Sequence, residues 1–301
     1  MVLAQARPSV GDRNKAVEAL NAMKAVRHAL ESKLPFSNRL IKEMHEVLLR
    51  GTENEDKRPG EFRDIQAWIG PEDDPENARF VPPPPGKLPD QVDACMNQLE
   101  IFANSPAGEI PDLAAVALIH YQFESIHPFR DGNGRVGRAI ILQELCNRRL
   151  LDLPVVFTSG YLYKHKQEYV DRLLAVSTEG DWIGWIRFFL DAVATQAAQT
   201  RVLAERLIGM HRRYTEAVRE MGASARLLTL VDSLFEWPVV TARSVEELLK
   251  VSNPTAREDI KRLESLDILQ ITEDVSYGKT WIPPEILSIV EVSDEELAEA
   301  K

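Results

Sequence analysis

Cysteine is scarce in this sequence, since Cys95 and Cys146 are the only two among 301 residues. They lie far apart and in no paired spacing, which supports neither a disulfide framework nor a zinc ribbon and favours a reducing compartment. Long apolar runs are also missing. The longest, Leu113–Ile119, is far too short to span a membrane, and residues 1–14 lack an apolar signal core. We therefore expect a soluble, cytoplasmic protein without a membrane partner.

Basic charge is in deficit, with 36 Lys and Arg against 47 Asp and Glu and a net charge of −11. This balance opposes general attraction to nucleic acid or anionic lipid, although a local basic patch can override it. The composition, 44% hydrophobic and 28% charged, is that of a globular protein. The length predicts about two domains.

Helical periodicity dominates the first two thirds of the chain. Apolar residues recur every three or four positions from Val17 to Leu34, and a second helix begins after the N-cap Ser37 and ends at Gly51. Residues 112–126 are apolar nearly all round, which is typical of a buried central helix. Further helices are predicted at 88–103, 134–150, 163–177 and 181–219.

Two segments depart from this helical pattern. Residues 61–69 and 78–81 are predicted to be short strands of a β-hairpin, and Pro82–Pro85 form a rigid spacer rather than a ligand for an aromatic groove. From residue 223, helices to 236, at 244–250 and at 255–266 precede strands at 268–272 and 277–281. That order predicts a small winged helix-turn-helix domain over 223–290, joined by a connecting helix at 206–222 and followed by an acidic tail at 291–301.

The residues from His127 to Arg138 read His-Pro-Phe-Arg-Asp-Gly-Asn-Gly-Arg-Val-Gly-Arg. The Gly-Asn-Gly run offers unobstructed backbone N–H groups at the start of a helix, and both features favour an anion. Arg135 and Arg138 can add forked contacts to two phosphates. Asp131 is a hard oxygen ligand suited to Mg²⁺, and a neutral His127 can accept a proton from a hydroxyl. This combination predicts phosphoryl or nucleotidyl transfer.

These twelve residues resemble the signature of the Fic (filamentation induced by cAMP) family, His-x-Phe-x-Asp/Glu-Gly-Asn-Gly-Arg-x-x-Arg, at every signature position. Similar Fic segments surround the motif, and the resemblance covers most of residues 15–290. These segments are Gly60–Arg63, Trp68–Gly70, Pro82–Pro85 and Tyr161–Leu173. Some Fic proteins also end in a winged helix. The resemblance implies a mainly α protein, with an all-helical Fic core over residues 15–205 and a β-hairpin flap.

The resemblance also implies roles for single residues. His127 would be the general base, Phe129 would anchor the loop, and Asp131 would bind Mg²⁺. Nucleotide binding would fall to Gly132, Asn133, Gly134, Arg135 and Arg138, with Tyr169 near the adenine. The flap would dock the target protein through Gln66, Trp68, Ile69, Phe80 and Val81. The implied activity is a protein adenylyltransferase, which moves AMP from ATP to a Ser, Thr or Tyr hydroxyl of a target or of itself.

Several alternatives stay open. Gly132–Gly137 also fits the dinucleotide pattern Gly-x-Gly-x-x-Gly, but a helix rather than a strand is predicted before it, which disfavours that fold. Some Fic relatives transfer other phosphate-containing groups. A winged-helix DNA-binding regulator is the other candidate, although residues 253–266 hold three basic and three acidic side chains. We expect a protein contact there instead. His120 is predicted to be a hydrogen-bonded core histidine.

Regulation is less defined by the sequence. Many Fic proteins carry an inhibitory Ser/Thr-x-x-x-Glu-Gly/Asn motif, and its nearest counterpart here, Ser105 with Glu109, is followed by Ile110. We interpret residues 1–14 as an N-terminal segment that is a candidate remnant of an inhibitory region. Inhibition in cis, in trans or none at all remain alternatives, as do the target, the nucleotide preference and the oligomeric state.

Overall fold

The structure is a computed structural model that describes residues 10–32, 34–70, 75–88, 91–105, 108, 110–222, 224–272 and 279–290. The chain forms two compact units, which divide between Ala197 and Ala198, within the 39-residue helix α8 (Trp182–Glu220). The N-terminal segment 1–9, the Ser105–Ile110 sequence in part, and the acidic tail 291–301 lie outside the described residues.

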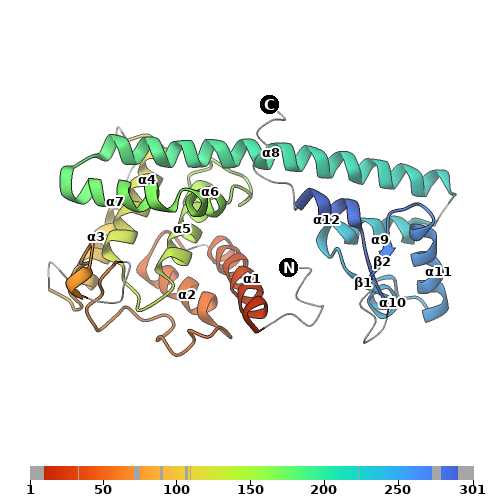
Figure 1. Ribbon diagram of the computed structural model, residues 1–301, viewed down its shortest axis with the longest axis horizontal. Coiled ribbons are helices and arrows are strands. Elements are labelled where there is room, and N and C mark those ends of the chain that lie inside the picture. Colours follow the sequence, from red (N-terminus) through yellow and green to blue (C-terminus); the bar gives the residue numbers. More distant parts are fainter. Residues whose placement is uncertain are drawn as a thin grey trace. The chain divides into compact units, whose positions relative to one another are not determined.

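Helices make up most of the first unit (Figure 1). They are α1 (Val10–Glu31), α2 (Asn38–Leu49), α3 (Val92–Asn104), α4 (Asp112–Ile126), α5 (Asn133–Asn147), α6 (Ser159–Lys164), α7 (Lys166–Glu179) and the first part of α8, with a 3-10 turn at Pro75–Asn77. The prediction for 112–126 is confirmed. The helix predicted at 163–177 is instead two helices, α6 and α7, which meet at His165.

Local sequence explains the helices that position the site. The hydroxyl of Ser37 accepts a hydrogen bond from the N–H of Leu40 at 3.3 Å and caps α2, as predicted. The central helix α4 packs against α3 and α5, while α1 packs against α2 and α5. Ile119 and Phe123 of α4 are fully buried, which confirms that α4 is a core helix. The end of α4 and the start of α5 are therefore held in a rigid frame.

The predicted strands 61–69 and 78–81 are not formed as a ladder. Within the described part of this segment, the structure has one antiparallel bridge, between Ile69 and Phe80, with N–H···O distances of 2.9 and 3.1 Å. The physical reason lies in the register, because that pairing places Ala67 opposite Pro82, and proline has no N–H to donate. The flap is thus two extended segments joined by this backbone bridge and by a side-chain bond from Gln66 to the Pro82 carbonyl.

The second unit has its own apolar core around Leu230, Leu234, Ile260 and Trp281. Its elements after α8 are α9 (Ala225–Glu236), β1 (Val240–Thr241), α10 (Ala242–Leu249), α11 (Asn253–Glu264), β2 (Gln270–Ile271), β3 (Thr280–Ile282) and α12 (Pro284–Val290). The three strands form an antiparallel sheet of order β1-β3-β2. The sequence did not predict β1, and the strands predicted at 268–272 and 277–281 are shorter or lie partly outside the described residues. A winged helix remains a prediction.

None of the helices within the described ranges is both long and apolar enough to cross a membrane.

Candidate active site

The loop between α4 and α5 contains two residues with left-handed backbone. His127 caps α4 with φ 49° and ψ 61°, and Gly132 precedes α5 with φ 79°. Glycine adopts this conformation freely, whereas histidine does so at a cost of about 1 kcal/mol or more. A strained conformation persists only where its surroundings fix it. We therefore expect hydrogen bonds from neighbouring residues to fix the backbone around His127.

One buried arginine fixes the first half of this loop. The side chain of Arg63 donates from Nε to the carbonyl of His127 at 2.9 Å and from Nη2 to the carbonyl of Ile126 at 3.4 Å. The backbone N–H of Arg63 donates to the carbonyl of Pro128 at 2.8 Å. These carbonyls follow the end of a helix and have no partner within it. Arg63 thus satisfies them and holds His127 in place.

The second half of the loop is fixed by Asn133 and His45. The amide of Asn133 accepts from the N–H of Phe129 at 2.8 Å and donates to the carbonyl of Phe129 at 2.9 Å. The ring of His45 stacks on Phe129 with centroids 3.8 Å apart and an interplanar angle of 11°. Its Nδ1 accepts from the N–H of Gly60 at 2.9 Å, so Nε2 carries the proton and donates to the carbonyl of Asp131 at 3.0 Å.

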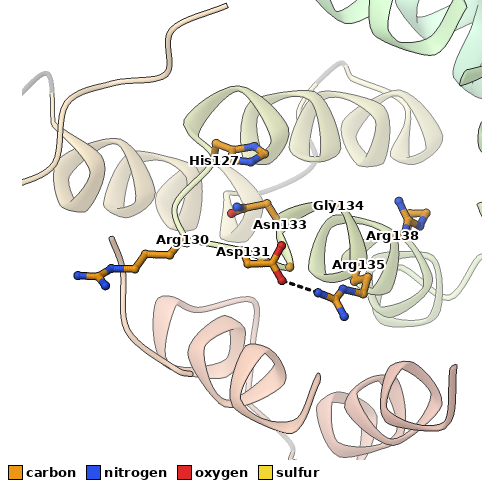
Figure 2. A pocket seen from close by; sticks show the side chains of 8 residues that line it. His127, Arg130, Asp131, Asn133, Gly134, Arg135 and Arg138 are labelled. Carbon is orange, nitrogen blue, oxygen red and sulfur yellow. Dashed lines mark hydrogen bonds and ion pairs between the residues drawn. The ribbon is translucent and has the colours of Figure 1, made fainter. Parts of the chain in front are cut away.

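A cavity of about 280 Å³ opens at this loop (Figure 2). The motif alone lines it, through His127, Arg130, Asp131, Gly132, Asn133, Gly134, Arg135 and Arg138. The structure therefore brings seven predicted site residues together, and adds Arg130, whose side chain points away from the others in Figure 2. Arg130 is instead bonded to Asp64 at the base of the flap, from Nε at 3.0 Å.

His127 is placed to act as a proton acceptor. Burial lowers its pKa to about 4; the charge of Arg63 adds to this, while the Glu124 carbonyl and the Asp131 charge oppose it. The imidazole is consequently neutral at pH 7. Nδ1 lies 3.3 Å from the carbonyl of Glu124, and a carbonyl can only accept. The proton belongs on Nδ1, which leaves Nε2 with a lone pair.

Arg135 and Arg138 differ in their surroundings. Arg135 lies between two carboxylates, with Nη2 2.7 Å from Oδ2 of Asp131 and Nη1 2.8 Å from Oε1 of Glu18 in α1. Figure 2 shows the Asp131–Arg135 pair. Arg138 has no ion pair with any described residue, and a Cβ at Gly134 would lie 3.2 Å from its Nη1. The guanidinium of Arg138 is thus the cation over the start of α5 that remains open to an anion.

A buried polar cluster lies next to Arg138. The hydroxyl of Tyr169 donates to Nε2 of His120 at 2.9 Å, and Nδ1 of His120 donates to the carbonyl of Gly137 at 3.2 Å. This confirms that His120 is a hydrogen-bonded core histidine. Burial raises the pKa of Glu124 to about 7, opposed by the charge of Arg138, and its Oε1 has no hydrogen-bond partner among the described residues. Tyr169 does not line the motif cavity.

The predicted docking residues lie on the flap, away from the cavity lining. Nε2 of Gln66 donates to the carbonyl of Pro82 at 2.9 Å, Ile69 pairs with Phe80, and Val81 is 60% exposed. Trp68 is partly buried. Arg79 beyond them pairs with Asp171 of α7 at 2.7 Å. The flap is therefore tied both to the motif loop, through Arg130 and Asp64, and to α7.

Three site residues were missed from sequence: Glu18, His45 and Arg63. His45 and Arg63 contact the loop from positions 86 and 64 residues earlier, so no local spacing links them to it. A signal existed for His45, because it falls on the buried face of α2 among Ile41, Met44 and Leu48, where a polar residue requires a partner. Arg63 was marked only as part of the Gly60–Arg63 segment that resembles Fic proteins, with no role assigned, and Glu18 carried no signal.

Residues 35–145 match the family model described as Fic/DOC family. The chain contains a Fic domain. That match extends from the loop before α2 to the last turn of α5, and so contains the whole cavity lining. The Fic domain and its flanks are 31% identical over 185 residues to the protein adenylyltransferase Fic of Aedes aegypti, covering 61% of this chain and 33% of that protein. The protein of the same name from Drosophila grimshawi is 29% identical over 188 residues, covering 61% and 34%.

The chain thus spans about a third of the length of these curated relatives. Among solved structures, a Fic family protein from Desulfovibrio desulfuricans G20 aligns with a TM-score of 0.50 and 21% identity, covering 88% of this chain and 74% of that one. At this identity the likeness concerns the fold alone. It agrees with a mainly helical Fic fold.

Proposed function

We propose that this chain is a protein adenylyltransferase, which transfers AMP from ATP to a Ser, Thr or Tyr hydroxyl of a target protein or of itself. The observation that carries the proposal is the cavity lined by the motif alone, where the neutral imidazole of His127 and one carboxylate lie with Arg135 and Arg138 beside the start of a helix. The names of the relatives support AMP as the transferred group.

In the proposed reaction, Nε2 of His127 accepts the proton of the target hydroxyl. The hydroxyl oxygen bonds to the α-phosphorus, the bond from that phosphorus to the bridging oxygen breaks, and pyrophosphate leaves. The low pKa of His127 keeps it unprotonated in the free protein. Bound triphosphate adds negative charge nearby and raises that pKa, which strengthens the base when substrate is present.

The phosphates would lie against Gly132, Asn133 and Gly134 at the positive end of α5. Because the Asn133 side chain is engaged by Phe129, we assign its contribution chiefly to loop shape and to its backbone. Arg138 and Arg135 would hold the outer phosphates, and Arg135 must exchange a carboxylate for a phosphate to do so. Tyr169 is proposed to lie near the adenine. Catalysis would rest on positioning and charge neutralisation.

Mg²⁺ is proposed as the cofactor, held by Asp131. The described residues contain no group of three His, Cys, Asp or Glu side chains that could bind a metal alone. One carboxylate together with substrate phosphates is, however, a common way to bind Mg²⁺, and Asp131 is the carboxylate that lines the cavity. When bound, Mg²⁺ would neutralise phosphate charge, and the chain's part is to present Asp131, fixed by His45.

The flap is proposed to dock the target segment through Gln66, Trp68, Ile69, Phe80 and Val81. Its open edge beyond the Ile69–Phe80 bridge, with Val81 exposed, suits pairing with an extended peptide. We place the catalytic domain at residues 15–205 in the cytoplasm, followed by the connecting helix at 206–222.

For residues 223–290 we propose a winged helix that contacts protein rather than DNA. The helix-strand-helix-helix-strand-strand order supports the fold. On α11, Arg262 is paired with Glu258 at 2.6 Å, whereas Arg257 is bonded to the neutral amide of Asn253 and keeps its charge. The support for a protein contact is the acidic balance of residues 223–290, which hold seven Lys and Arg against eleven Asp and Glu. Asp259 is buried against Arg226 and does not oppose DNA directly. Selection from a random duplex pool tests this: a defined site bound with sub-micromolar affinity and lost on Arg257→Ala would favour a DNA-binding regulator.

Labelled nucleotides test the activity. With Mg²⁺, ATP carrying the label on the α-phosphate should label the protein or a target, whereas ATP labelled on the γ-phosphate should not. Transfer from the γ-position alone would establish a kinase in place of the adenylyltransferase. Transfer from another nucleotide, and none from ATP, would favour the alternative of a Fic relative with a different donor.

A further inference from the structure

Arg63 is a buried cation with an unusual set of partners. Its side chain is 3% exposed, and among the described residues it forms no ion pair. It donates instead to four backbone carbonyls. Burial lowers its pKa to about 10, so the guanidinium stays charged at pH 7. A buried charge of this kind is retained only where its hydrogen bonds are nearly complete.

The four carbonyls come from three separate parts of the chain. Two belong to Ile126 and His127 at the end of α4. One belongs to Ile65, where the chain enters the flap, at 3.0 Å from Nη1. The last belongs to Pro83, where the chain leaves the flap, and accepts from Nη2. One planar group therefore joins the residue that carries the base to both ends of the flap.

Few other contacts could do this. Among the described residues, the two flap segments share one backbone bridge, Ile69–Phe80, because the prolines that follow have no N–H with which to extend it. The side chain of Gln66 adds one bond to the Pro82 carbonyl, but this bond does not reach the motif loop. Asp64 and Arg130 also link the flap base to the motif loop, but both are on the surface, where an ion pair contributes little. The buried, directional link is the one through Arg63.

We propose that Arg63 is a positioning residue that sets the place of the flap relative to His127. This positioning role rests on the proposed function, since the flap matters to catalysis only if a target hydroxyl docks there. In that reaction the hydroxyl oxygen must lie within hydrogen-bond reach of Nε2 of His127 while its backbone pairs with the flap. A shift of about 1 Å between the two is enough to cost about a hundredfold in rate.

The test uses the full chain with Arg63→Lys and Arg63→Ala, and Arg39→Lys as the matched control, because Arg39 is an exposed arginine of α2 whose ion pair, with Glu43, lies on the surface. Three quantities are measured: ATP binding by calorimetry, self-transfer of AMP at saturating Mg-ATP, and hydrogen exchange of the Ile69 and Phe80 amides. Arg63→Lys keeps the charge, but one ammonium cannot reach all four carbonyls.

The expected result is a ten- to hundredfold loss of self-transfer in Arg63→Lys, with ATP stoichiometry retained and affinity within threefold. Exchange at Ile69 and Phe80 should become at least tenfold faster, while Arg39→Lys changes nothing. In Arg63→Ala, millimolar guanidinium should restore part of the rate, and methylammonium should not.

A loss of rate that only matches a loss of ATP stoichiometry would mean that Arg63 is merely structural, and would overturn the proposal. Unchanged exchange at Ile69 and Phe80 would overturn it too. If Arg63→Ala does not fold, the rate and the hydrogen exchange of Arg63→Lys decide whether the proposal holds. If the unaltered protein transfers no AMP, the proposed function fails, while the exchange experiment still decides whether Arg63 holds the flap.

Discussion

Replacing His120 by Gln should reduce the sensitivity of the fold to acid. Nδ1 of His120 donates to the Gly137 carbonyl and Nε2 accepts from the Tyr169 hydroxyl, and a Gln amide can make both kinds of bond. Gln, however, does not titrate. The two proteins therefore differ mainly in whether a proton is taken up at this position.

The magnitude follows from the pKa of His120. Burial lowers it to about 3 in the folded protein; the charge of Arg138 adds to this and the Gly137 carbonyl opposes it. An unfolded histidine titrates near pH 6.5. Below that pH the unfolded chain binds a proton that the folded chain excludes, so stability is lost as pH falls. From pH 7.5 to 5.5 the loss through His120 is about 1.4 kcal/mol.

Urea denaturation at pH 7.5 and 5.5, followed by tryptophan fluorescence, measures the difference. Burial also raises the pKa of Glu124 nearby, which acts in the opposite direction but is present in both proteins. The variant should lose about 1.4 kcal/mol less unfolding free energy than the unaltered protein over this range. An equal loss in both proteins would refute the assignment of a neutral, buried His120.

Three further predictions concern the motif. Asn133→Ala removes both hydrogen bonds to the Phe129 backbone and should lower the unfolding free energy by about 2 kcal/mol, measured by denaturation; an unchanged value would mean that the loop does not depend on this amide. Gly137→Ala should lower the unfolding free energy by about 1–3 kcal/mol, because the new Cβ would lie 2.2 Å from Oε1 of Glu124 and 3.1 Å from the His120 ring. An unchanged unfolding free energy in the same assay would contradict that packing. Arg138→Ala should weaken ATP binding about ten- to a hundredfold in calorimetry, because it removes a charge-assisted contact to an outer phosphate, and should change AMP binding little. Equal weakening of ATP and AMP binding would show that Arg138 contacts a different phosphate from the one assigned.

The parts of the fold that sequence predicted well are those determined by neighbouring residues. α4 has its predicted ends because a mostly apolar segment lies between Pro111 and the His127 turn. The motif is twelve consecutive residues at a helix start, so the sequence alone shows that its side chains lie close together. The site residues outside the motif could be identified only from the folded structure.

The failures share one physical cause, which is pairing across long sequence separations. The sequence predicted two strands for the flap because the periodicity of residues 61–69 does not show which residues they pair with. In the structure, the positions opposite residues 61–67 begin at Pro82, which has no N–H to donate. The charge balance of α11 counted Asp259 as a surface charge, although Arg226 binds it in the interior at 2.7 Å. Glu18, His45 and Arg63 fix the motif from α1, α2 and the flap base, and their partners could be identified only once these elements were packed.

The central claim is AMP transfer with His127 as the base, and intact-mass analysis tests it most directly. The unaltered protein and His127→Ala are each incubated with Mg-ATP, alone and with a cell lysate, after calorimetry has established that both bind ATP. The account predicts one or more added AMP masses on the protein or on a lysate protein with the unaltered chain, and none with His127→Ala. Equal transfer by His127→Ala, or no AMP addition by the unaltered chain, would contradict it.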